Sequence, residues 1–482
     1  MNNEMTKKDT DKDNNKKNRS ETDKLEKKRA RQKKQKDLIK SRHISQTHFI
    51  AAGFLLMILL GGFLLMLPIS SRDRTWTDPL SALFTATSTS CVTGLAVVDT
   101  YSHWSLFGQV VLLTLIQIGG LGFITIGVGF SMVFRRRIGL RQRDLLKESV
   151  NAFEIGGIIR LWKNIFYGTL IFEGAGAFAL AFRFIPEYGF ARGLWYSIFH
   201  SISAFCNAGF DLFGQKEKYS SFVYYVSDPL VNIVLCLLII IGSLGFVVWK
   251  DLVANGFHFK KYALHTKLVI VINTVLIIGG AVFLFISEYG NTIADFDMKT
   301  KILASLFGSV TTRTAGFNTV DTAALTPASK LVTMILMFVG GSPGSTAGGI
   351  KTTTFAVILI SVLSNLRNQS GANVFKRRVS EDVVSKAYQV FMLNLILALT
   401  SMTLILLTSN LKFDDVLFEV ISAVSTVGMT TGITRDLNTF GRIMIMLLMY
   451  AGRIGSMTFA LSLISPNKKQ PVTLPVEKIT IG

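Results

Sequence analysis

The chain has 482 residues, of which 49% are hydrophobic and 36 are Phe, while only 9 are Pro. Its mean hydropathy of +0.43 is higher than that of an ordinary soluble domain. The composition therefore predicts a polytopic membrane protein. The net charge of +20 raises nucleic-acid binding as an alternative, but basic residues gather beside apolar runs and no recognition motif accompanies them. Six His and scattered acids, with no nucleophile and base at a recognisable spacing, do not indicate an enzyme.

The N-terminal stretch is polar and the rest of the chain is predominantly apolar. Residues 1–48 contain 16 Lys and Arg against 8 Asp and Glu, which predicts a disordered basic tail and is too long a charged stretch for a signal peptide. Crossing a bilayer takes about 20 apolar residues. Eight runs are long enough, near 48–69, 105–134, 160–185, 229–250, 265–287, 331–364, 387–409 and 440–465.

Basic residues follow the second, fourth and sixth of these runs, at 135–147, 250–267 and 367–386. Loops that carry excess Lys and Arg stay in the cytoplasm, and such loops also suit anionic lipid. We therefore expect both termini to be cytoplasmic, in a multi-pass protein of the plasma membrane.

Four short Ser/Thr-rich segments lie between the apolar runs: LFTATSTSCVTGL (83–95), IFHSISAFCNAGF (198–210), LFGSVTTRTAGF (306–317) and LFEVISAVSTVGM (417–429). In each segment a Phe is followed by a Gly. The Gly comes nine residues after the Phe in the segment at 306–317 and ten residues after it in the other three. Gly94, Gly209, Gly316 and Gly428 are 115, 107 and 112 residues apart, which indicates a repeated unit. The sequence predicts an all-α polytopic membrane protein with four tandem helix, pore loop, helix repeats, eight transmembrane spans in all, around a pseudo-fourfold pore.

The residues at these glycines suit a dehydrated cation. Rings of backbone carbonyls replace its hydration shell, and the φ freedom of Gly lets successive carbonyls point inward. Thr-Val-Gly in the fourth copy is close to potassium-channel filters, but each copy keeps one Gly, so we expect K⁺ preference with weaker exclusion of Na⁺. The predicted filter residues are Val92, Thr93, Gly94, Asn207, Ala208, Gly209, Thr314, Ala315, Gly316, Thr426, Val427 and Gly428.

A Gly- and Pro-rich stretch, GGSPGSTAGG, interrupts the sixth apolar run. Such density breaks a helix, and irregular backbone at membrane depth must be buried in protein or line an aqueous cavity. A phosphate-binding P-loop is the competing interpretation, but Ile350 separates Gly349 from Lys351 and no strand precedes it. The predicted gate consists of Gly340, Gly341, Ser342, Pro343, Gly344, Ser345, Thr346, Ala347, Gly348, Gly349, Lys351 and Arg453.

Two charged residues lie inside apolar runs. Arg453 in the eighth run needs water or polar partners at that depth, so we expect it to project into an aqueous cavity, with a snorkelling structural arginine as the alternative. Glu173 in the third run is expected to be structural and packed against a polar partner, with a functional site as the alternative. The three Cys residues have neither a disulfide framework nor a metal-site spacing.

Together the four filter segments, GSTAGGIKTTTF and YAGRIGSMTF resemble the Ktr/Trk/HKT superfamily of potassium transport proteins, and specifically the membrane subunit of bacterial Ktr-type systems, over residues 48–482. The resemblance implies that the four glycines above form the selectivity filter, that 340–349 is an intramembrane gating loop, and that Arg453 lies below the filter.

The same resemblance implies partners that no residue pattern in this chain reveals. It implies a homodimer with one pore in each protomer, and a cytoplasmic ring of nucleotide-binding RCK subunits that gates the pore according to ATP or ADP. K⁺ is then the transported ion, Na⁺ an activator, and nucleotide acts only through the partner subunit.

The expected segments are a cytoplasmic tail (1–47), repeat one (48–134), an amphipathic cytoplasmic linker (135–157), repeat two (158–250), repeat three with a broken second helix (251–364), repeat four (365–465) and a C-terminal cytoplasmic tail (466–482). Two mechanisms stay open. One is a gated, channel-like conduit for K⁺ uptake. The other is a symporter coupling K⁺ to Na⁺ or H⁺ by alternating access, of which broken helices at the midplane are a usual sign.

Overall fold

The computed structural model describes residues 46–133, 139–149, 156–256, 258–369 and 371–463, together with 475, 477, 479 and 480. Contacts within the chain divide it into two units, Met1–Phe49 and Ile50–Gly482. The first unit is described only by its last four residues, which begin helix α2. The predicted N-terminal tail and most of the predicted C-terminal tail lie outside the described residues.

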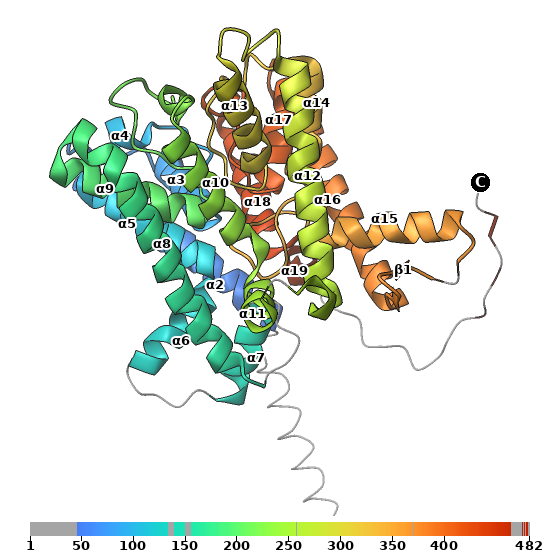
Figure 1. Cartoon of the computed structure of the whole chain (residues 1–482). Helices are drawn as coiled ribbons and strands as arrows, with labels where there is room; N and C mark the ends of the chain where they lie inside the picture. Colours follow the sequence, from blue (N-terminus) through green and yellow to red (C-terminus); the bar gives the residue numbers. More distant parts are fainter. Residues whose placement is uncertain are drawn as a thin grey trace, which may run out of the picture. The chain divides into compact units, whose positions relative to one another are not determined.

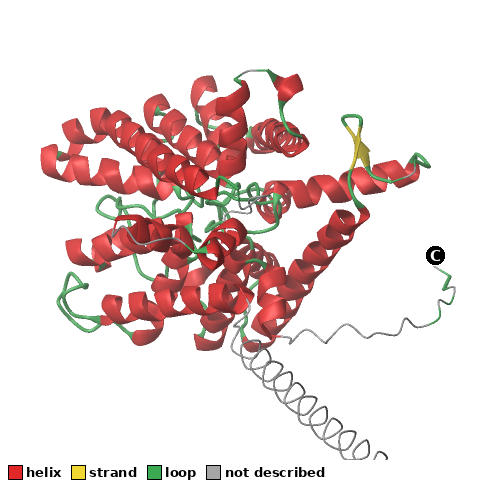
Figure 2. Ribbon diagram, turned by 90° about the horizontal axis from the view of Figure 1, so that it is seen from below, coloured by secondary structure: helices red, strands yellow, loops and turns green. Residues whose placement is uncertain are grey.

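Helices account for nearly all regular structure in the described residues (Figure 2). The strands β1 (Asn373–Val374) and β2 (Arg377–Arg378) form one short antiparallel hairpin, in which Asn373 pairs with Arg378. The predicted helical character is therefore confirmed.

One order of elements occurs four times along the chain: a long helix, a short helix, an irregular segment ending beyond a glycine, and a second helix that is interrupted (Figure 1). The first set is α2 (Gln46–Met66), α3 (Pro79–Ser90), α4 (Thr100–His103), α5 (Leu106–Leu121) and α6 (Phe123–Val133). The second is α8 (Ile158–Tyr188), α9 (Phe190–Phe205), η1 (Val223–Tyr225), α10 (Pro229–Leu244) and α11 (Phe246–Asn255). The third is α12 (Leu264–Glu288), α13 (Met298–Thr311), α14 (Pro327–Phe338) and α15 (Thr352–Leu366), and the fourth is α16 (Glu381–Thr408), α17 (Phe413–Val424), η3 (Ile433–Arg435), α18 (Thr439–Ile454) and α19 (Ser456–Leu463).

Two shorter elements connect these sets. Helix α7 (Leu140–Ser149) lies within the predicted amphipathic linker, and η2 (Phe259–Lys261) precedes α12. Local sequence explains several helix starts: Asp78 accepts a hydrogen bond from Ser81 N at 2.9 Å before Pro79, and Asp228 caps α10 before Pro229 in the same way. A carboxylate cap followed by Pro satisfies a free N–H and fixes φ for the first turn.

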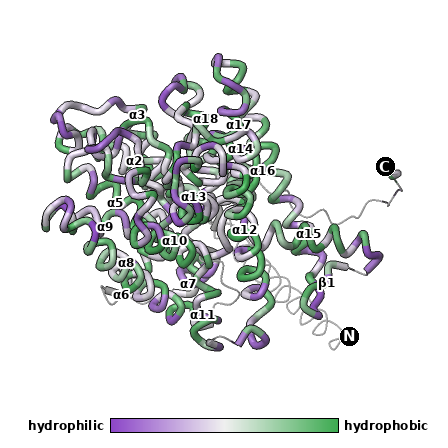
Figure 3. Tube along the Cα trace, turned by 45° about the horizontal axis from the view of Figure 1, so that its top comes forward, coloured by the Kyte–Doolittle hydropathy of each residue, from purple (hydrophilic) through white to green (hydrophobic). Residues whose placement is uncertain are grey.

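Four helices in the described residues have the length and apolar composition needed to cross a bilayer: His48–Met66, α8, α12 and α16. Hydrophobic colour follows α12 and α16 in Figure 3. Two further apolar helix pairs, α5 with α6 and α10 with α11, are bent by 96° and 98°. The second and fourth apolar runs are thus each divided into two helices at a bend, and by length at most six of the eight predicted spans are counted among the described residues.

The bends have a local cause. Gly122, Gly245 and Gly455 end α5, α10 and α18 with φ of 83°, 98° and 89° and ψ near 135°, a conformation that side chains with a Cβ avoid. Each is the second glycine of a Gly-x-x-Gly sequence, and the third set has Gly341 and Gly344 at the same places, the latter with φ 65°. Hydropathy alone does not reveal these bends, since the residues on both sides are apolar.

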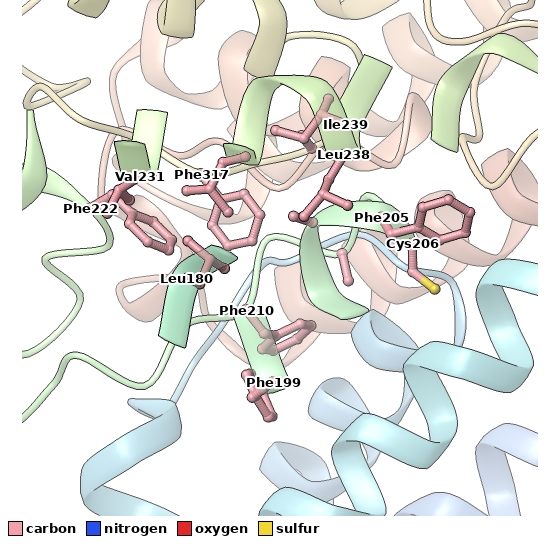
Figure 4. Packing of buried hydrophobic residues seen from close by; sticks show 14 of the residues in the cluster. Leu180, Phe199, Phe205, Cys206, Phe210, Phe222, Val231, Leu238, Ile239 and Phe317 are labelled. Carbon is pink, nitrogen blue, oxygen red and sulfur yellow. The ribbon is translucent and has the colours of Figure 1, made fainter. Parts of the chain in front are cut away.

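Aromatic side chains fill the space around the second short helix. Figure 4 shows Phe199, Phe205, Phe210 and Phe222 from the second set beside Phe317 from the third. The Phe222 and Phe317 rings are 5.2 Å apart and edge to face. This packing joins the irregular segment after α9 to that after α13.

Candidate functional site

The four predicted filter segments share an unusual backbone. Each has two positive-φ residues, separated by one ordinary residue, and the second is the glycine. Alternation of this kind turns successive carbonyl groups toward one side, and non-Gly residues adopt positive φ only where surrounding structure enforces it. The φ values are 56°, 58°, 68° and 51° for Val92, Asn207, Thr314 and Thr426, and 98°, 71°, 79° and 93° for Gly94, Gly209, Gly316 and Gly428.

The four glycines lie next to one another in a closed cycle. A methyl group at each would meet the carbonyl oxygen that precedes the next glycine, and the last returns to the first. At Gly94 it would lie 2.7 Å from Ala208 O, and at Gly209 2.8 Å from Ala315 O. At Gly316 it would meet Val427 O and at Gly428 Thr93 O. Segments more than 100 residues apart thus meet at one point, with no room for a side chain.

A hydroxyl group supports each turn from the short helix before it. Ser88 Oγ accepts from Gly94 N at 3.1 Å, and Ser422 Oγ accepts from Gly428 N at 3.0 Å. Ser203 Oγ, at the same distance from its glycine along the chain, accepts from Phe210 N at 3.1 Å. In the third segment, which is one residue shorter, Thr311 Oγ1 donates to Phe317 O at 2.5 Å, as Ser203 Oγ also donates to Phe210 O at 2.8 Å.

We expect Ser422→Ala to lower the free energy of unfolding by about 1 to 3 kcal/mol, because the buried Gly428 N–H loses its acceptor. Thermal or denaturant unfolding of the purified protein measures this change. Ser409→Ala is the matched control, since the Ser409 hydroxyl, directly after α16, donates to Ile405 O of that helix at 2.8 Å and supports no filter segment. An equal effect of both substitutions would contradict the assignment.

A cavity of about 80 Å³ lies on one side of the glycine ring, the side where the residues that follow the glycines are found. All four glycines line it, together with Asp99 and Asp211. Asp99 is held by hydrogen bonds from Ser102 N at 2.7 Å and Tyr219 N at 3.1 Å. Arg435 also lines the cavity, so its lining has two acidic side chains and one basic side chain. Sequence analysis did not single out Asp99.

The Gly- and Pro-rich stretch lies against the other side of the ring. Helix α14 ends at Phe338 and α15 begins at Thr352, and in Figure 1 α14 runs upright while α15 runs across the view. A methyl group at Gly349 would lie 2.9 Å from Ser425 O, and one at Gly340 3.2 Å from the side chain of Thr314. This loop therefore contacts residues that precede the third and fourth filter glycines.

Backbone hydrogen bonds fix the loop to the bend between α10 and α11. Ser342 N donates to Ser243 O at 2.9 Å, and Phe246 N donates to Gly344 O at 2.7 Å. Thr346 Oγ1 reaches Phe205 O, at the end of α9, at 3.0 Å. Gly340 N also donates to Ile350 O at 2.8 Å, closing the loop at its base. The irregular backbone is thus satisfied within the protein, as membrane depth requires.

Arg453 and Lys351 hold the loop from the side away from the filter. The Arg453 guanidinium donates to Thr346 O in the loop and to Gly119 O and Gly120 O at the end of α5, the last at 2.9 Å. Lys351 Nζ donates to Ala347 O at 2.7 Å. Both side chains line a cavity of about 470 Å³. The predicted gate residues are therefore brought together in one place.

Arg313 is a residue of this site that sequence analysis missed. It immediately precedes the third filter triplet, is only 1% exposed, and donates from Nη1 to Val339 O at 2.7 Å and Gly340 O at 3.3 Å. Its Nε and Nη2 lack hydrogen-bond partners in the described part of the chain. The signal was in the alignment of the four segments, because Cys91, Cys206 and Ser425 occupy the equivalent places.

Glu173 is partnered as expected for a structural residue. Its carboxylate accepts from Gln117 Nε2 at 3.2 Å and from Cys206 Sγ at 3.8 Å, and Ser201 Oγ donates to its backbone carbonyl at 2.6 Å. The cysteines Cys91, Cys206 and Cys236 are free and buried.

Known proteins share the sequence and the fold of this chain. Residues 25–470 match the family model described as TrkH, cation transport protein. The chain is 39% identical over 448 residues to the potassium/sodium uptake protein NtpJ of Enterococcus hirae, covering 92% of this chain and 98% of that protein. It is 41% identical over 432 residues to the Ktr system potassium uptake protein B of Bacillus subtilis, covering 89% and 95%. The solved structure of the potassium transporter TrkH from Vibrio parahaemolyticus has the same fold, with a TM-score of 0.67 at 18% identity over 86% of this chain and 85% of that one.

Long apolar helices together with these matches define a multi-pass membrane transport protein. The chain belongs to the TrkH family of cation transport proteins, within the Ktr/Trk superfamily that the sequence motifs resembled.

Proposed function

We propose that this chain is the ion-translocating membrane subunit of a potassium uptake system and that it conducts K⁺ across the plasma membrane. The observation that carries the proposal is the closed cycle of four glycines, each preceded by a carbonyl group directed at its neighbour. Carbonyl oxygens arranged in a ring replace the hydration shell of a cation. The names of the relatives, which include potassium uptake proteins, support K⁺ as the cation.

In this proposal each of the four element sets is one repeat, so that eight membrane segments surround a pseudo-fourfold pore. The three interrupted apolar segments and the loop-broken sixth then each count as one segment. The twelve residues from the triplets at 92–94, 207–209, 314–316 and 426–428 form the filter. With both termini cytoplasmic, the 80 Å³ cavity faces outward and the 470 Å³ cavity faces inward.

The loop at 340–349, Lys351 and Arg453 form the gate of the proposed pore. The loop lies between the filter and the inner cavity, and two cationic side chains hold it there. A fixed positive charge on the path opposes the passage of a cation.

Deleting residues 343–347 should therefore raise K⁺ flux through purified protein in liposomes about tenfold, which corresponds to a barrier lower by about 1.4 kcal/mol. Thermal unfolding checks that the shortened protein is folded. Unchanged flux through a folded deletion variant would remove the loop from the gate.

The partners of the proposed subunit are a second copy of the chain and a cytoplasmic RCK-type ring that binds nucleotide, with Na⁺ as an activator. The relatives named as Ktr system components support a multi-component system. Exposed basic residues of the β1–β2 hairpin, Arg377 and Arg378, give an acidic partner a surface to contact.

The direct test measures K⁺ uptake into liposomes under an imposed membrane potential, without any Na⁺ or H⁺ gradient. Uptake that follows the potential supports the channel-like conduit. Uptake that requires a gradient of a second ion would replace the conduit with a K⁺/Na⁺ or K⁺/H⁺ symporter, for which the broken helices offer a structural reason.

A further inference from the structure

The inner cavity of about 470 Å³ has a strongly positive lining. Lys351 and Arg453 both line it and are partly exposed to it. They hold adjacent carbonyl groups of the loop, those of Ala347 and Thr346, so both charges lie at one place. No Asp or Glu is among the described residues that line the cavity.

Neither charge is neutralised by a carboxylate. The ion pairs found among the described residues involve other cations, at Arg183, Lys216, Lys330 and Arg378. The partners of Lys351 and Arg453 are neutral carbonyl groups, which use two of the three Lys351 ammonium protons and leave the Arg453 Nε–H free for a further acceptor. Two like charges in a partly dry site without a counter-ion are costly.

Helix starts add to the positive field. The first residues of α6, α11 and α19 line the cavity: Phe123, Phe246 and Ser456. The glycine bends at residues 122, 245 and 455 place these starts there. The partial positive charge at a helix N-terminus favours an anion, and at α11 the Phe246 N–H is itself bonded to Gly344 O. The hydroxyl groups of Ser456 and Thr458, also in the lining, are further donors.

We propose that this cavity binds an oxyanion of the phosphate class, held by Lys351 and Arg453. An ammonium and a guanidinium group with hydroxyl and backbone N–H donors match the charge and the acceptors of phosphate. The bound anion offsets the positive charge that a cation would otherwise meet below the filter. The proposal goes beyond cation conduction and assigns the cavity a ligand of opposite charge.

The test uses the full chain in nanodiscs of pure phosphatidylcholine and measures calorimetric binding of inorganic phosphate, with potassium chloride at matched ionic strength as reference. The expected result is saturable binding that weakens about tenfold or more in Lys351→Gln, because one charge-assisted hydrogen bond is lost. Lys250→Gln is the matched control, since Lys250 is exposed and outside the cavity. Arg453→Gln replaces Lys351→Gln where the latter does not fold.

A second arm distinguishes a free anion from a lipid headgroup. In nanodiscs containing phosphatidic acid, a headgroup in the cavity should raise the unfolding temperature of the parent and of Lys250→Gln but not of Lys351→Gln. The proposal is overturned if neither inorganic phosphate nor phosphatidic acid has a saturable effect, or if the effect persists in both cavity variants. Binding is read without ion flux, so its failure leaves the proposed K⁺ conduction intact, and failure of conduction leaves the binding result intact.

Discussion

Replacing Gly316 with Ser should lower the preference for K⁺ over Na⁺ about tenfold. Gly316 has φ 79°, where a residue with a Cβ is disfavoured by about 1 to 2 kcal/mol. The new Cβ would also meet Val427 O and lie 3.2 Å from Gly428 Cα. These atoms belong to the neighbouring filter segment, so relief of the clash moves a carbonyl group of the proposed ion site. A loss of about 1.4 kcal/mol at one site is a tenfold change.

The measurement is the reversal potential with K⁺ on one side of the membrane and Na⁺ on the other. Gly279→Ser in α12 is the matched control, because a Cβ there meets nothing within 4 Å. A selectivity change confined to Gly316→Ser supports the ring as the filter. Equal selectivity of the parent and Gly316→Ser would contradict the assignment of the ring as the filter. Strict exclusion of Na⁺ by the parent would contradict the separate expectation that this filter excludes Na⁺ only weakly.

Replacing Arg313 with Gln should raise the K⁺ leak of the closed protein several-fold. Arg313 ties the start of the loop, through Val339 O and Gly340 O, to the third filter segment. Glutamine is too short to keep both bonds, and each lost bond to a charged donor weakens the tether by about 1.5 to 3 kcal/mol. The loss of a buried cation with two unpaired donors offsets much of this in overall stability, so function should change more than the free energy of unfolding.

Flux into liposomes without any activating partner measures the leak, and thermal unfolding measures stability. Arg313→Lys keeps a positive donor and should restore most of the closed state. A leak that stays at the parent level in Arg313→Gln, with the protein folded, would show that the tether does not restrain the loop.

The period of the glycines predicted which distant segments meet. Four Phe-to-Gly segments at nearly equal intervals indicate four equivalent positions around one centre. The contacts that run in a cycle through Gly94, Gly209, Gly316 and Gly428 agree with that prediction. The density of Gly and Pro after Phe338 predicted the interruption between α14 and α15 for the same reason, since backbone preference there outweighs hydropathy.

Local apolar patterns gave no warning of the bends at Gly122 and Gly245. A hydrophobic helix that continues and one that turns through 96° have the same hydropathy, and the difference lies in the backbone conformation of the glycine, φ 83° at Gly122. Packing constrains the same stretch, because Gly119 leaves no room for a Cβ beside Ser90 O at the end of α3. The roles of Arg453 and Arg313 as ties between segments also required the fold, because their acceptors are backbone carbonyls 26 to 334 residues away along the chain.

The third filter segment is one residue shorter than the others, and its supporting hydroxyl group belongs to Thr311 where the other three segments use a serine. Its short helix is followed by Arg313, which donates to the start of the loop. The other arginine that contacts the loop, Arg453, belongs to the fourth set. In a pore assembled from four identical chains, every substitution is installed four times. In the proposed pore each quarter of the glycine ring is encoded separately. A single codon therefore alters one wall of the ring while three keep their original chemistry, and variants with one altered wall are accessible by ordinary mutagenesis.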